Sequence, residues 1–142
     1  MIKEFEDVRY WKALRGIGAD ESQPMNERLQ SQFQRVMQEI IEIHDALVKN
    51  DDHEFKDAIG DSIVTLINIA AIKNYNAEDC LEQAYGVIKL RKGLTSDSGD
   101  FVRYAKLNDE DKLVCDNQQG NPGNEYFDES NIGKLSPESF LK

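Results

Sequence analysis

Two helical patterns that meet at a short polar turn constrain the fold of this chain more than any other feature. Residues 32–72 read QFQRVMQEIIEIHDALVKNDDHEFKDAIGDSIVTLINIAAI, and the apolar residues on both sides of the turn at 50–52 recur at intervals of three and four. The end of the later pattern, SIVTLINIAAI, is apolar on nearly every side, which is typical of a helix buried over most of its surface. The sequence therefore predicts an all-α bundle built on a long antiparallel helix hairpin.

Acidic side chains lie on one face of each helix in this hairpin. Glu39 and Glu42 are three residues apart, Asp57 and Asp61 are four apart, and residues at these spacings share a helix face. Asp61 begins the apolar run, where burial of a carboxylate is costly unless it is paired or binds a cation. We expect the hairpin to gather all four carboxylates around a metal ion. Hard oxygen ligands favour Mg²⁺, with Mn²⁺ as the alternative.

The polar stripe of the later helix continues beyond its acids. Thr65 and Asn68 follow Asp61 at spacings of four and three, so they share its face. A buried polar stripe needs partners, and the acidic edge of the earlier helix is the nearest candidate. An adaptor protein has no need to bury such a stripe, which favours a binding or catalytic site.

Four cations and one aromatic residue each have a structural and a functional interpretation. Arg35, one turn before the first acid, either pairs with that acid or contacts a substrate phosphate. Lys89, Arg91 and Lys92 either stabilise the C-terminal end of a helix or hold substrate phosphates. Trp11 either packs in the core or stacks on a base.

A di-iron centre fits the acids less well than Mg²⁺ does. Di-iron bundles use Glu-x-x-His on two helices, and the residues three positions after Glu39, Glu42 and Glu54 are all acids. His44 lies on the apolar face of its helix, and we expect it to be a core residue.

In all, we expect four helices, at residues 2–14, 24–49, 52–73 and 77–92, and the second and third of these form the hairpin. Asp51 and Glu54 have the spacing of a helix-capping pair, and Gly93 is a natural helix stop. A turn at 97–100 and a short strand at 101–104 follow. We expect an all-α domain over residues 1–94, and a β-turn segment with an acidic polar tail over 95–142 that docks on the bundle or on a neighbouring subunit.

Charge and composition exclude several classes of protein. A net charge of −10 and the absence of a basic helix face argue against nucleic-acid binding. Cys80 and Cys115 match no metal or redox spacing, which indicates free thiols in a reducing cytoplasm. The sequence contains neither a signal-peptide core nor an apolar run long enough to span a membrane. We therefore expect a cytoplasmic protein.

Several of these motifs resemble those of the MazG-like nucleotide pyrophosphohydrolases of the all-α NTP pyrophosphatase superfamily, in particular the small single-domain members. Trp11 and the Arg-Gly-Ile at 15–17 resemble the family's W…RGI entry, and residues 32–42 resemble its Q-x-x-K-x-x-x-E-x-x-E helix. DAIGD followed by VTLINIA resembles the second motif, and IKLRKG resembles the closing basic segment. The likeness covers residues 8–93. It departs at Ala58, where the family's E-x-x-D motif has an acid.

The resemblance implies Mg²⁺-dependent hydrolysis of a nucleoside triphosphate, a dNTP in particular, to the monophosphate and pyrophosphate. It transfers catalytic and metal-binding roles to Glu39, Glu42 and Asp61, and a metal-binding role to Asp57. The candidate substrate-binding residues are Arg35, Asn68 for a base or sugar, Trp11, and Lys89, Arg91 and Lys92 for the distal phosphates.

A homodimer or homotetramer is expected from the amount of apolar surface, in agreement with what the resemblance implies. Two short flanking helices cannot cover a hairpin that contains one nearly all-apolar helix. Two other functions stay open: a non-catalytic acidic interaction protein, and a nucleotide-binding regulator that lost turnover through the departure at Ala58.

Overall fold

The computed structural model describes residues 2–118. The chain divides into two compact units, Met1–Gln83 and Ala84–Lys142. The division falls inside helix α4 (Ala77–Ile88), whereas the sequence suggests a boundary after residue 94. The described chain is mostly helical, with one small two-stranded sheet, which confirms the all-α class.

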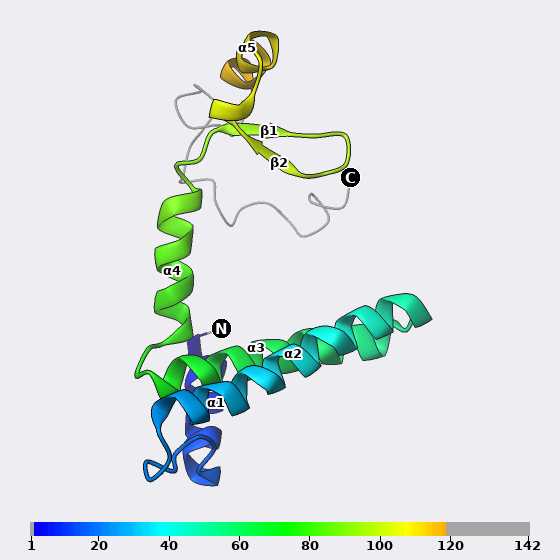
Figure 1. Ribbon diagram of the computed structural model, residues 1–142. Helices are drawn as coiled ribbons and strands as arrows, with labels where there is room; N and C mark the ends of the chain where they lie inside the picture. The colour runs from blue at the N-terminus through cyan, green and yellow to red at the C-terminus, as the bar shows by residue number, and fades with distance from the viewer. Residues whose placement is uncertain (1, 119–142) are drawn as a thin grey trace. The chain divides into compact units, whose positions relative to one another are not determined.

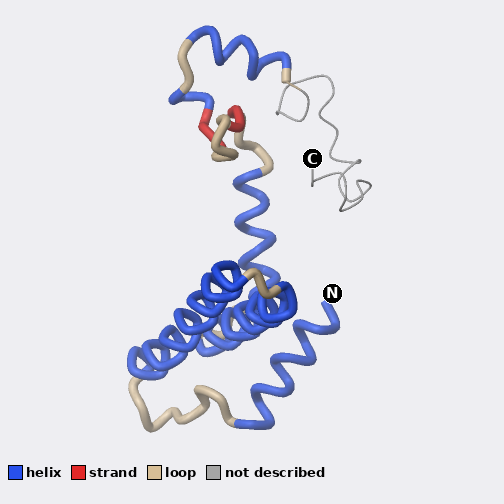
Figure 2. Tube along the Cα trace, turned by 90° about the vertical axis from the view of Figure 1, so that its right-hand side faces the viewer, coloured by secondary structure: helices blue, strands red, loops and turns tan. Residues whose placement is uncertain are grey.

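The first unit is built on α2 (Met25–Lys49) and α3 (Asp52–Ile72), which lie side by side and run in opposite directions (Figure 1). Helix α1 (Ile2–Arg15) packs against α3 (Figure 2). The most buried positions of the two long helices include small residues, with Ala46 only 1% exposed and Ala58 only 2% exposed. Small side chains at buried positions allow two helices to approach closely.

The turn between α2 and α3 is fixed by local hydrogen bonds. Asn50 ends α2 in the left-handed conformation, with φ of 54°, and the N–H of Asp51 donates to the Ala46 carbonyl at 3.0 Å. The Asp51 carboxylate then accepts from the N–H of Glu54 at 3.0 Å and caps α3, as the sequence predicts. These contacts reverse the chain within two residues.

A partly buried ion pair joins α1 to the first turn of α4. Arg9 donates from Nη1 and Nη2 to the two carboxylate oxygens of Glu78, at 2.7 and 2.6 Å. The Arg9 guanidinium lowers the pKa of Glu78 below its ordinary value. This two-point contact fixes the start of α4 within the first unit.

The second unit contains the end of α4, a hairpin of β1 (Gly93–Thr95) and β2 (Phe101–Arg103), a short 3₁₀ turn η1 (Tyr104–Lys106) and α5 (Asp109–Asn117). The strands are antiparallel, with Gly93 opposite Arg103. A Cβ at Gly93 would lie 2.1 Å from the Val102 carbonyl oxygen, so this close approach requires glycine. Cys115 on α5 is fully buried, whereas Cys80 is exposed.

Three sequence expectations for this region need correction. The fourth helix ends at Ile88 instead of residue 92, because strand pairing extends the backbone from Gly93, which begins a strand and does not stop a helix. The segment expected to be an acidic polar tail contains α5, which is capped by Asn108 through the N–H of Asp111 at 2.7 Å. The rest of the expected tail lies outside the described residues.

Many large apolar side chains of the hairpin are exposed, although the periodic pattern places them on an inner face. His44, expected in the core, has a side chain that is 76% exposed. Helix α3 packs against α2 and α1, and these contacts leave another side of each long helix in contact with solvent. More than a third of the surface is exposed in Phe33, Met37, Ile40, Ile41, Ile59, Ile63 and Leu66. Among the described helices, none has both the length and the apolar character needed to cross a membrane.

Candidate functional site

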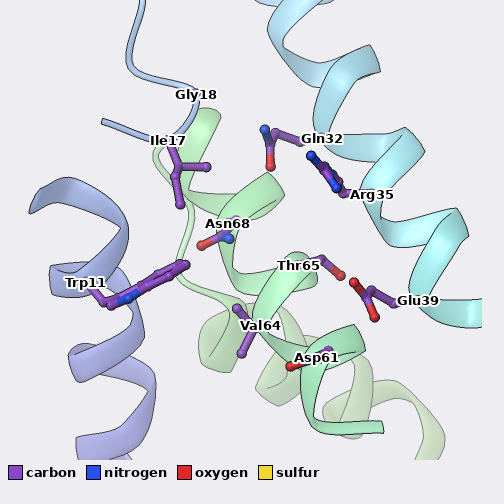
Figure 3. A pocket seen from close by; sticks show the side chains of 10 residues that line it. All are labelled: Trp11, Ile17, Gly18, Gln32, Arg35, Glu39, Asp61, Val64, Thr65 and Asn68. Atoms are coloured by element: carbon purple, nitrogen blue, oxygen red, sulfur yellow. The ribbon is translucent and has the colours of Figure 1, made fainter. Parts of the chain in front are cut away.

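A cavity of about 480 Å³ lies in the first unit, between α1, α2, α3 and the loop after α1 (Figure 3). It contains aromatic, polar and acidic side chains from all four segments, so a ligand here would contact each of them. The lining residues are Trp11, Ile17, Gly18, Gln32, Arg35, Glu39, Asp61, Val64, Thr65 and Asn68.

Glu39 is the most perturbed group in this cavity. Burial is the main cause that raises its pKa; the negative charges of Glu42 and Asp61 raise it further, and Arg35 partly opposes them. Its Oε2 atom is buried and has no hydrogen-bond partner in the described part of the chain. Glu42 and Asp61 therefore lie close enough to Glu39 to repel its charge, and Glu39 has a carboxylate oxygen without a partner in the described residues.

Asp61 lies where the sequence predicts but in a different environment. We expected a buried acid, and its side chain is exposed, although it lines the cavity on the α3 side below Thr65 (Figure 3). Its sequence neighbours Ile59 and Ile63 are exposed as well, but on nearly the opposite side of α3, because two positions along a helix correspond to a rotation of about 200°. The apolar run therefore does not bury Asp61 in a single chain.

Asp57 is separated from the other acids. It is exposed, it does not line the cavity, and it is not among the charges that perturb Glu39. Ala58 is the buried residue of the pair. Neighbouring residues on a helix point about 100° apart, so the acid at 57 lies off the face that Ala58 presents to the hairpin interior. The described structure thus brings three of the four predicted acids together.

Within residues 2–118, no group of three or more His, Cys, Asp or Glu side chains is arranged to hold a metal ion.

Asn68 and Trp11 line the part of the cavity beyond the acids. Asn68 is only 5% exposed, and its buried Oδ1 atom has no hydrogen-bond partner in the described residues. Trp11 lies across from Asn68 (Figure 3) and remains 41% exposed, with the Arg15 guanidinium 4.7 Å from the ring centroid. An unsatisfied acceptor opposite an aromatic ring suits a flat ligand that carries a hydrogen-bond donor.

Arg35 lines the cavity without a firm partner. Its guanidinium is exposed and makes one long contact of 3.5 Å, to the Gln38 side chain. No ion pair joins it to a carboxylate of the described chain, which leaves the guanidinium available to a phosphate.

Lys89, Arg91 and Lys92 belong to the second unit and have local contacts of their own. Lys89 lies 5.8 Å from the centroid of the Tyr85 ring. Lys92 pairs with Asp116, which raises the pKa of Lys92, and it also lies 4.7 Å from the Tyr104 ring. Arg91 is exposed. None of the three lines the cavity of the first unit, and their phosphate-binding role stays a prediction.

Gln32, Ile17 and Gly18 line the cavity but were not among the candidate residues. Gln32 precedes Arg35 by three positions, so the stripe of polar residues on α2 extends one turn further than the predicted site. That spacing was a usable signal. The contribution of the loop depends on its fold, which no spacing rule predicts.

Comparison of the chain with protein-family models, curated proteins and solved structures finds no match. The likeness to the pyrophosphohydrolases therefore depends on the motifs quoted above.

Proposed function

We propose that this chain is a Mg²⁺-dependent nucleoside triphosphate pyrophosphohydrolase. It hydrolyses a nucleoside triphosphate, a dNTP in particular, to the monophosphate and pyrophosphate, and contributes to control of the cytoplasmic nucleotide pool. The observation that carries the proposal is Glu39, whose pKa is raised by burial and by two neighbouring acids and whose Oε2 atom lacks a partner.

The residues around Glu39 fit a hard divalent cation. Carboxylates that repel one another are stabilised by a cation between them, and an unpartnered carboxylate oxygen is a ready ligand. Glu39, Glu42 and Asp61 would hold Mg²⁺, whereas Asp57 lies apart from them. When bound, the ion would supply charge neutralisation at the phosphates and an acidified water.

The chain's own groups account for the remaining roles. Burial raises the pKa of Glu39 above its ordinary value, which suits a carboxylate that accepts the proton of the attacking water. Arg35 lies one turn before Glu39 on α2 and binds phosphate oxygens. The Trp11 ring stacks on the base, and Asn68 Oδ1 accepts from a donor on the base or sugar.

A second copy of the chain is part of the proposal. The exposed apolar side chains of α2 and α3 would be covered in a homodimer or homotetramer, as a contiguous apolar face favours.

One observation favours a second candidate, a nucleotide-binding regulator without turnover. The position at which the family motif has an acid is occupied here by Ala58, which is buried. Such a protein would still use Trp11 and Asn68 to bind a nucleotide.

One experiment separates these functions. The protein is incubated with Mg²⁺ and a panel of canonical and modified NTPs, and both pyrophosphate release and nucleotide binding are measured. Release that is lost in Glu39→Gln and Asp61→Asn, and kept in Glu82→Gln, supports the enzyme. Binding without release identifies the regulator, and neither activity indicates a non-catalytic interaction protein.

A further inference from the structure

A second cavity lies within the second unit and shares no residue with the candidate site. It has a volume of about 420 Å³ and lies between the end of α4, the segment that follows α4, and strand β2. Its lining combines apolar side chains and aromatic rings with two cations, which suits an aromatic group flanked by negative charge. The lining residues are Tyr85, Ile88, Lys89, Arg91 and Phe101.

The apolar side chains around this cavity are held in place but remain in contact with solvent. Tyr85 and Ile88 are three residues apart on α4 and share a face, and they are 37% and 50% exposed. A Cβ at Gly93 would lie 2.6 Å from Phe101 Cζ, so the Phe101 ring lies over the Gly93 backbone, and Phe101 is 50% exposed. Large apolar side chains that converge on one cavity and stay in contact with water indicate a docking site.

Lys89 and Arg91 bring positive charge to the same cavity. The Lys89 ammonium lies 5.8 Å from the centroid of the Tyr85 ring. Arg91 is exposed, and no carboxylate of residues 2–118 forms an ion pair with it. An occupant with carboxylates on either side of an aromatic residue would therefore match both the apolar walls and the cations.

The last described helix ends close to this cavity. Helix α5 ends at Asn117. The Asp116 carboxylate pairs with Lys92 and accepts from the Tyr104 hydroxyl at 3.4 Å. Lys92 directly follows Arg91, which lines the cavity. The described chain therefore ends beside one wall of the cavity.

One segment beyond position 118 has the composition that the cavity requires. Residues 125–129 read EYFDE, with two aromatic residues between acids. The first of these aromatic residues, Tyr126, follows Gln118 by eight positions, and eight residues span up to about 27 Å when extended. The remaining aromatic residue of 119–142 is Phe140, which has Lys142 two positions later and therefore suits a positively charged cavity less well.

We infer that residues 125–129 bind in the cavity of the second unit of the same chain. At least one of the rings of Tyr126 and Phe127 packs against the apolar walls, and the flanking carboxylates contact Lys89 and Arg91. This contact is independent of the proposed function, because the proposed catalytic residues belong to the first unit. It gives Lys89 and Arg91 a role within the chain instead of at substrate phosphates.

The first test is proteolysis of the full chain with a protease that cuts after aromatic residues. A docked segment is cut only when it opens, so cleavage after Tyr126 and Phe127 should be about tenfold or more slower than in a free peptide of residues 119–142. Cleavage after Phe140 should proceed at similar rates in the chain and in the peptide. Arg91→Gln should restore fast cleavage at the first two sites.

The matched control is Lys106→Gln, which removes a cation of the second unit that does not line this cavity. It should leave cleavage after Tyr126 and Phe127 slow. Equal cleavage rates at these two sites in the chain and in the peptide, or an equal effect of Arg91→Gln and Lys106→Gln, would overturn the contact. Arg91 is exposed, and circular dichroism checks that Arg91→Gln keeps the fold.

The second test measures the contact as binding between two molecules. The full chain with Tyr126→Ala and Phe127→Ala no longer fills its own cavity, and a fluorescent peptide of residues 119–133 is titrated into it up to about millimolar concentration, the effective concentration of a short tether. We expect saturable binding that weakens about tenfold when Arg91→Gln is added, and that also weakens at high salt. No binding, or binding that does not depend on Arg91, refutes the contact.

A third measurement assigns the segment to its own chain. Unlabelled and isotope-labelled chains are mixed in denaturant and refolded together, and a carbodiimide then joins Lys89 to the carboxylates of residues 125–129. We expect cross-links within chains of one isotope. Cross-links between the two isotopes would show that the segment binds a neighbouring subunit, and would overturn the assignment to the same chain.

Discussion

Asp61 on α3 lies close enough to Glu39 on α2 to perturb it across the hairpin. The pKa of Glu39 is raised first by burial, then by the charge of Glu42, and then by that of Asp61. Groups from both helices therefore determine the protonation of one carboxylate, and the predictions that follow concern this coupling and the contacts around it.

The substitution Glu39→Gln should stabilise the metal-free protein near neutral pH while it removes activity. A carboxyl whose pKa is raised on folding favours the folded state below the unfolded pKa, and that advantage is lost as the pH rises through the folded pKa. The free energy of unfolding of the variant should therefore equal that of the unaltered chain at pH values below the ordinary pKa of a glutamate. At pH 7 it should be higher. We expect a gain on the order of 0.5 kcal/mol, the scale of partly exposed charge interactions. Urea unfolding between pH 4 and 8 measures it, with Glu82→Gln as the control.

The substitutions Asp57→Asn and Asp61→Asn should have different effects on the pKa of Glu39. Asp61→Asn removes a charge that raises the pKa of Glu39, so the midpoint of the Glu39 carboxyl in an NMR titration should fall. Asp57→Asn should leave that midpoint in place, because Asp57 does not contribute to it. A fall of similar size in both variants would mean that Asp57 lies nearer to Glu39 than the structure shows.

Addition of Mg²⁺ should stabilise the unaltered chain more than the Glu39→Gln variant. An ion that binds only the folded state stabilises it by about 2.7 kcal/mol at 100 times its dissociation constant. Thermal unfolding with and without Mg²⁺, and with chelator added back, measures the effect. An equal response of both chains would exclude Glu39 as a ligand.

The Arg9–Glu78 pair should contribute measurably to stability, unlike the exposed pair on the same helix. Both Arg9 and Glu78 are partly buried and their contact is bidentate, whereas the Lys3–Asp7 pair is largely exposed. In double-mutant cycles we expect a coupling of about 1 kcal/mol for the first pair and close to zero for the second. The pKa of Glu78 is lowered on folding, so its contribution is present above the unfolded pKa and is lost as the pH falls through the folded pKa.

The substitution Asn68→Leu should separate ligand binding from stability. Its Oδ1 atom is buried without a partner, so an apolar side chain of similar size removes an unsatisfied group and should keep or raise the free energy of unfolding. Nucleotide binding, measured by Trp11 fluorescence, should weaken at least tenfold. A large loss of stability would show that Asn68 has a structural partner instead.

Local signals in the sequence were enough to predict the hairpin. The period of three to four residues places the helices, and the Asp51–Glu54 spacing places the turn, because each depends on contacts within a few residues. The end of α4 was missed because it depends on Gly93 pairing with Arg103, ten positions away. The exposure of His44 was missed because periodicity shows which residues share a face and does not show what covers that face.

The sequence predicted part of the candidate site, namely the grouping of three acids. Helical spacing brings Glu39, Glu42 and Asp61 together, as the perturbed pKa of Glu39 reflects. The same reasoning fails for Asp57, since a shift of one residue rotates a side chain by about 100° around the helix.

The small size of the two alanines buried in the hairpin influences the distance between the acids of α2 and α3. Ala46 follows Glu42 by four residues and Ala58 precedes Asp61 by three, so each lies about one turn from an acid. The distance between packed helices depends on the volume of the side chains at their contact. A single added methyl group at either alanine would increase the distance between α2 and α3. It would therefore also increase the distance between the carboxylates that a bound ion would contact. The affinity of the carboxylates for metal is thus open to tuning by the steric bulk of residues that carry no charge.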